Sequence, residues 1–84
     1  MFIVVTGQQH RMREVPAYLY EGQRVVQQPE ENYFKSYTLI VDTGSEDRYR
    51  AEYVKDRLSS GMFGTVLFET LAEAQQFVEE GKKL

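Results

Sequence analysis

The chain contains no cysteine, and this absence excludes a disulfide framework and a thiolate metal site. Small secreted domains usually depend on such cross-links, so the sequence predicts a reducing, cytoplasmic location. No apolar run approaches the ~20 residues that span a membrane. The N-terminal residues also lack the basic and apolar regions of a signal peptide. We therefore expect a protein that does not associate with membranes.

The chain also has no large excess of charge of one sign and no catalytic motif. The formal net charge is −3, and no segment is strongly basic, which argues against nucleic acid as the partner. The single histidine, His10, cannot alone supply the three protein ligands of a catalytic zinc site. No serine lies in a nucleophile motif, and no glycine-rich phosphate loop occurs. We expect no catalytic activity, no cofactor and no metal.

The length of 84 residues predicts one small domain, 1–84. With 42% hydrophobic residues, the chain is too apolar to be disordered. Alternating and β-branched patterns predict strands over 2–6, 34–42 and 62–68, and a hairpin over 16–28. A helix is expected to open at Ser45 as its N-cap and to end at Gly61. A second helix is expected to start at the capping box of Thr70 and Glu73.

This order of elements, β-ββ-β-α-β-α, predicts an α+β fold. We expect a four- to five-stranded, mostly antiparallel sheet with both helices packed on one face. The β-α-β stretch over 36–68 is also compatible with a right-handed parallel crossover.

The segment Met62–Phe68 is apolar on both faces when it is read as a strand. Side chains alternate across a strand, so this segment must be covered on both sides. Two helices on one face of the sheet would leave the other face open as an apolar patch. Such patches usually mark interaction sites.

Aromatic residues cluster within a short stretch that also contains basic residues. Tyrosine and arginine are enriched at protein-binding hot spots. The hypothesis is therefore a non-catalytic protein–protein interaction domain, such as a small regulator or inhibitor, including one encoded by a mobile element. Its partner would be another protein or a second copy of the chain in a homodimer. The predicted partner-binding residues are Tyr18, Tyr20, Tyr37, Arg11, Arg13 and Lys35.

Two other interpretations of these residues stay open at the level of sequence. Tyr33 and Phe34 belong to the same cluster, which is also compatible with core packing or with stacking on single-stranded nucleic acid. The alternative function is binding of nucleic acid or of a small anionic ligand through the loop with His10, Arg11 and Arg13 and the nearby tyrosines.

Overall fold

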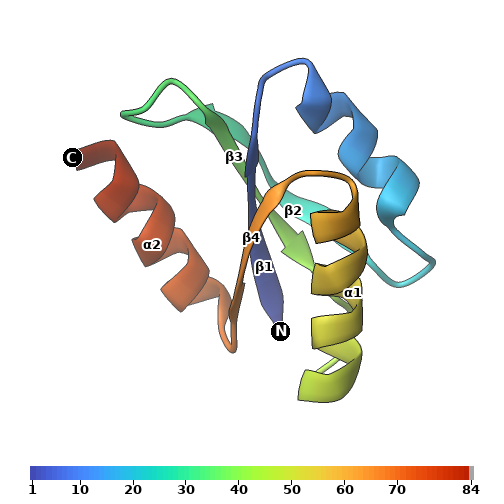
Figure 1. Ribbon diagram of the computed structural model, residues 1–84. Coiled ribbons are helices and arrows are strands. Elements are labelled where there is room, and N and C mark those ends of the chain that lie inside the picture. The colour runs from blue at the N-terminus through green and yellow to red at the C-terminus, as the bar shows by residue number, and fades with distance from the viewer. Residues whose placement is uncertain (84) are drawn as a thin grey trace.

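A computed structural model describes residues 1–83 and consists of one sheet between helices on its two faces (Figure 1). The strands are β1 (Phe2–Gly7), β2 (Arg24–Glu31), β3 (Tyr37–Asp42) and β4 (Gly64–Phe68). The helices are η1 (Arg11–Tyr18, a 3₁₀ helix), α1 (Arg48–Ser60) and α2 (Leu71–Lys83). None of the helices within residues 1–83 has the length and apolar character that crossing a membrane requires.

The sheet has the order β2-β3-β1-β4, and every neighbouring pair is antiparallel. The predicted α+β class with a four-stranded antiparallel sheet and two α-helices is therefore confirmed. Because β3 and β4 are both antiparallel to β1, they run parallel to each other with β1 between them. The β3-α1-β4 stretch is thus a crossover that skips one strand rather than a pair of adjacent parallel strands.

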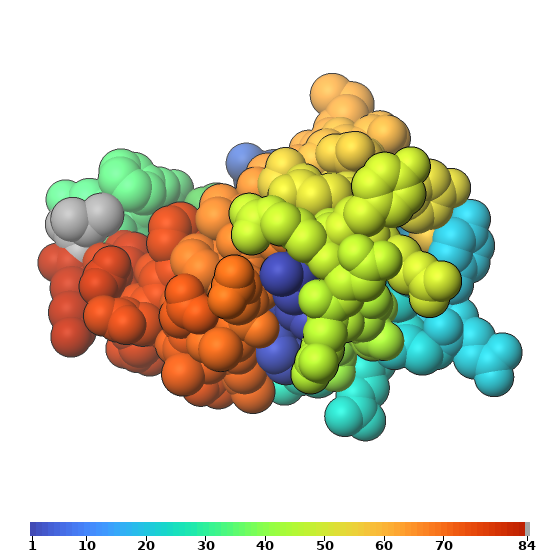
Figure 2. All heavy atoms as spheres, turned by 90° about the horizontal axis from the view of Figure 1, so that it is seen from below, coloured from blue at the N-terminus to red at the C-terminus, as the bar shows by residue number. Residues whose placement is uncertain are grey.

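The expectation that both helices pack on one face is wrong. Side chains of α1 and η1 bury one face of the sheet with Ile3, Val5, Leu39 and Val41. Side chains of α2 bury the other face, and this second cluster is formed by Val4, Ile40, Ala74 and Val78. Viewed along the sheet, the start of β1 lies between α2 on one side and α1 on the other (Figure 2).

The central strands β1 and β3 explain this arrangement. Each contains three consecutive fully buried apolar residues, Ile3–Val5 in β1 and Leu39–Val41 in β3. A strand with such a run has apolar side chains on both faces, so both faces need a cover. The sheet therefore lies between two helical layers.

The predicted hairpin over 16–28 is also wrong. Residues Arg11–Tyr18 form η1, in which Met12 and Val15 are buried and Pro16 lies inside the helix. A short 3₁₀ helix accommodates proline because its fixed φ suits helical backbone and few hydrogen bonds are lost. The strand that follows begins at Arg24 and extends to Glu31, so it continues beyond residue 28, where the predicted hairpin ended.

Helix termini agree with the sequence more closely. In α1, the buried stripe is Ala51, Val54 and Leu58, and the N-cap is not Ser45 but Asp47, whose carboxylate accepts a hydrogen bond from Tyr49 N at 3.0 Å. In α2, Glu73 N donates to Thr70 Oγ1 at 3.2 Å, which confirms Thr70 as the cap, but the Glu73 carboxylate accepts from the Thr70 hydroxyl at 2.9 Å and not from its backbone N–H, so only half of the predicted capping box is formed.

Candidate protein-docking surface

The three tyrosines predicted to bind a partner do not form an open sheet face. Tyr18 and Tyr37 are half-buried and pack against the core on the α1 side, where Tyr18 meets the Phe63 ring edge-on at 5.8 Å. Tyr20 is 56% exposed and lies in the turn after η1. The Arg57 guanidinium stacks on its ring at 3.6 Å from the centroid. Two of the three tyrosines therefore serve folding, which is the core interpretation left open by the sequence.

The predicted cations are likewise divided between folding and surface. Arg11 forms an ion pair with Glu14 at 2.5 Å and donates to the Gly61 carbonyl oxygen at 2.7 Å, so η1 is tied to the end of α1. Arg13 and His10 are exposed beside it. Because Glu14 compensates the charge of Arg11, the geometry does not favour anion binding here, and this alternative stays a prediction.

Lys35 belongs to a tight turn that joins β2 to β3 and presents two aromatic rings to solvent. Tyr33 is 62% exposed and Phe34 is 71% exposed, and their rings contact edge-to-face at 5.3 Å. Lys35 adopts a left-handed backbone conformation with φ 58°, which closes the turn. Exposure of this extent means that these rings contribute little to folding.

The side chain of Asn32 holds this turn in shape. Its Oδ1 accepts hydrogen bonds from Phe34 N at 3.0 Å, from Ser36 N at 3.1 Å and from Ser36 Oγ at 2.9 Å. Asparagine is suited to this role because its short amide can bond the backbone two residues further on. The aromatic rings are thus displayed on an ordered turn, which lowers the entropy lost when a partner binds.

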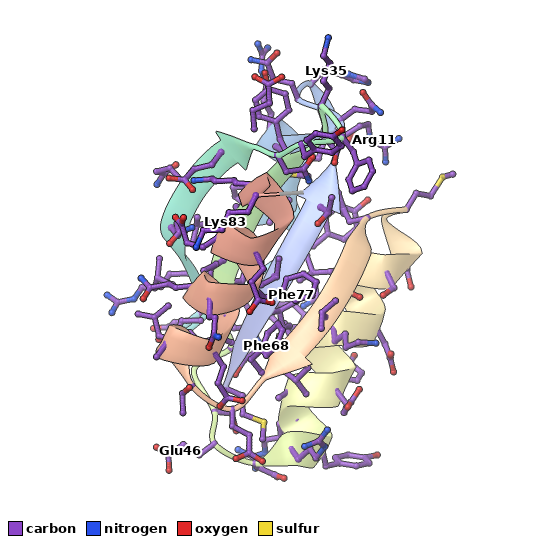
Figure 3. The ribbon with its side chains drawn as sticks, turned by 90° about the vertical axis from the view of Figure 1, so that its left-hand side faces the viewer. Arg11, Lys35, Glu46, Phe68, Phe77 and Lys83 are labelled. Carbon is purple, nitrogen blue, oxygen red and sulfur yellow. The ribbon has the colours of Figure 1, made fainter. Side chains whose placement is uncertain are left out.

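A half-open groove of about 640 Å³ lies between this turn and the C-terminal part of α2. Phe34 forms part of one wall, and Phe77 and Val78 come from α2. The exposed lining surface of the groove is mainly apolar, although six of the ten lining residues are polar or charged. Figure 3 shows Phe77 on α2, Lys83 near its end and Lys35 at the tip of the turn. The remaining residues that line the groove are Thr6, Asn32, Ser36, Thr38, Glu80, Gly81 and Lys83.

One ion pair links α2 to the sheet beside the groove. Lys82 of α2 forms an ion pair and hydrogen bond with the Glu30 carboxylate of β2. This hydrogen bond with Glu30 is the main cause of a raised pKa of Lys82. Because Lys82 is used in this way, Lys83 is the cation of α2 that lines the groove.

The groove and a pair of exposed aromatic residues on α1 were not predicted from the sequence. In the groove, Phe77 of α2 is 43% exposed. Tyr49 and Tyr53 are 82% and 57% exposed on the solvent side of α1. Their spacing of four residues on a predicted helix, out of phase with Ala51, Val54 and Leu58, was the signal that could have found them.

The groove brings together two aromatic rings and the cation of Lys83. Within residues 1–83, no three His, Asp or Glu side chains converge in a way that could hold a metal ion. Comparisons with protein-family models, with curated proteins and with solved structures find no match for this chain.

Proposed function

We propose that this protein is a non-catalytic docking domain that binds another protein through the groove between α2 and the Tyr33–Phe34 turn. The observation that carries the proposal is the exposure of Phe34, 71%, on a turn that one asparagine holds through three hydrogen bonds, two from backbone N–H groups and one from the Ser36 hydroxyl. A ring kept in water by an ordered turn has no role in folding, so a binding role explains it best.

The shape of the groove indicates the chemistry of its occupant. A concave, mainly apolar site takes an apolar anchor side chain, and such anchors account for most of the affinity at protein interfaces. We propose that the partner inserts one aromatic or branched aliphatic side chain between Phe34 and Phe77. Lys35 and Lys83, next to these rings, would pair with carboxylates that flank the anchor.

A regulator or inhibitor of the bound protein fits such a domain. It would act by occupying the partner's surface, which requires no cofactor or metal. We keep a cytoplasmic location as part of this proposal because the cysteine-free sequence suits a reducing compartment.

Peptide selection followed by NMR tests this proposal. Short peptides would be selected from a random library on the immobilised protein, and the best one titrated into ¹⁵N-labelled protein. We expect the selected peptides to share an apolar anchor and to shift the amide signals of Phe34, Phe77 and Gly81. Phe34→Ser should weaken binding at least about tenfold, since burying an aromatic ring contributes about 1.5–3 kcal/mol.

Tyr49→Ser is the matched control, because Tyr49 is a comparably exposed aromatic on α1 and is not part of the groove. It should leave the affinity unchanged. Binding that maps to another surface, or that is equally strong in Phe34→Ser, would overturn the proposal.

A further inference from the structure

The two edges of the sheet differ in how they are protected against pairing with another chain. The edge strand β2 carries Arg24, Pro29, Glu30 and Glu31, and its register with β3 shifts twice. Charge, proline and irregular register are the devices by which proteins block edge-to-edge association. The other edge strand, β4, has the sequence GTVLF and a regular register with β1, so it carries none of these devices.

The outer side of β4 is open along its length. Within residues 1–83, no backbone hydrogen bond joins Gly64–Phe68 to any strand or loop other than β1. On the α2 side, Val66 is 39% exposed, and Phe68 is half-buried against the Phe77 ring at 5.3 Å. Figure 3 shows β4 at the side of the sheet that α2 leaves uncovered, with Phe68 and Phe77 beside it. Unpaired backbone groups and exposed apolar side chains thus occur on one short strand.

The side of α1 next to β4 carries charges that would pair with those on the same side of a second copy. Two contacts define this side: Arg48 Nη1 lies 3.8 Å from a carboxylate oxygen of Glu69, and Ser59 Oγ lies 2.7 Å from Thr65 Oγ1. Glu52 and Lys55 lie between Arg48 and Ser59 on the same stripe of the helix. When this stripe is placed antiparallel to a copy of itself, Glu52 of one copy falls opposite Lys55 of the other.

The same two contacts determine where the axis of such a pair would pass. The stripe begins level with Glu69 and ends level with Thr65, so its middle lies level with Leu67. A two-fold axis at Leu67 places Val66 opposite Phe68 of the second copy, because antiparallel residues pair symmetrically about the axis. The same register therefore brings apolar side chains together on the α2 side of the sheet and opposite charges together on the α1 side.

We infer that β4 pairs antiparallel with β4 of a second copy, about a two-fold axis at Leu67, to give a continuous eight-stranded sheet. This interface is separate from the groove proposed to bind a partner protein, although Phe77 borders both. Its self-complementarity is what an isologous dimer requires. A five-residue strand makes a small interface, so the dimer is expected to dissociate on dilution.

Light scattering coupled to size exclusion, over a series of protein concentrations, tests the inference. We expect a mass that rises from monomer toward dimer with concentration. Val66→Lys should abolish this rise, because a charge on each copy would lie within the apolar contact. Tyr53→Lys adds the same charge at a more exposed position on the solvent side of α1, and it should dimerise as the parent protein does.

Hydrogen exchange gives a measurement that does not depend on how Val66→Lys folds. Amides of Gly64–Phe68 that point away from β1 should exchange at least about tenfold more slowly at high than at low protein concentration, since pairing protects them. A protein that stays monomeric at every concentration would overturn the inference. So would a dimer that persists in Val66→Lys and in which the amides of β4 gain no protection at high concentration. Phe34→Ser should still dimerise, which separates this result from failure of the groove proposal.

Discussion

Truncation of Ile40 tests the central feature of the fold, the burial of the sheet on both faces. Ile40 is completely buried on the α2 side, where it packs with Val4, Ala74 and Val78. Its neighbour Leu39 is 2% exposed and packs on the opposite side with the α1 cluster. Ile40→Ala and Leu39→Ala therefore probe the two faces at adjacent positions of one strand.

The expected loss of stability follows from the atoms removed. Each substitution deletes three buried carbon atoms, and the transfer term of about 0.8 kcal/mol per carbon gives about 2.4 kcal/mol. A cavity left in a close-packed core adds to this, so the free energy of unfolding should fall by about 3 kcal/mol. An 84-residue domain has about 4–12 kcal/mol in total, so either variant should lose a large fraction of its stability.

Urea unfolding followed by circular dichroism measures this loss. With an m-value of about 1 kcal/mol/M, the midpoint of Ile40→Ala should fall by about 3 M, as should that of Leu39→Ala. Ile40→Val, which removes one carbon, should lose about 1 kcal/mol. If Leu39→Ala loses about 3 kcal/mol and Ile40→Ala less than about 1 kcal/mol, α2 does not bury the second face, and the description of a sheet between two helical layers is refuted.

Three further predictions concern local features of the chain. Gly44→Ala should lower the free energy of unfolding by about 1–3 kcal/mol more than Gly22→Ala does. Both glycines have a positive φ, but a Cβ at Gly44 would collide with the carbonyl oxygen of Gly22, whereas a Cβ at Gly22 would meet no atom. Equal urea midpoints of the two variants would contradict this. Thr70→Ala should lose about 1 kcal/mol in the same assay through loss of the N-cap of α2, and an unchanged midpoint would exclude that role. Because Glu30 raises the pKa of Lys82, the stabilisation is fully present below the unfolded pKa of lysine and is lost as pH rises through the higher folded pKa. Urea midpoints should therefore fall more from about pH 9 to about pH 11.5 in the parent protein than in Glu30→Gln, and parallel declines would refute this.

The segment Met62–Phe68, which was predicted to be a strand with apolar residues on both faces, shows what a sequence pattern does not reveal about a strand. It was expected to need covering on both faces, but β4 is the edge strand and Val66 stays partly exposed. The strands buried on both faces are β1 and β3, whose runs of β-branched and aliphatic residues are equally two-sided in the sequence. A two-sided pattern shows that a strand has apolar residues on both faces, but not whether it lies at the centre or the edge of a sheet.

Docking residues were the least predictable part of the molecule for a related reason. Tyr18, Tyr37 and Phe34 are similar in type and close in sequence, yet the first two pack against the core and the third is 71% exposed. The difference depends on η1 and the Asn32 turn, neither of which the sequence reasoning identified. The face that each ring occupies follows from the conformation of these short segments.

Local order was determined by the sequence itself: the α+β class, the Thr70 cap of α2 and the buried stripe of α1 all depend on residues within a few positions of each other. Only the tertiary structure decided which face each helix covers, which strand lies at the open edge and which aromatics stay in water. Those outcomes depend on contacts between residues far apart in the chain, because strands with apolar side chains on both faces accept a helix on either side.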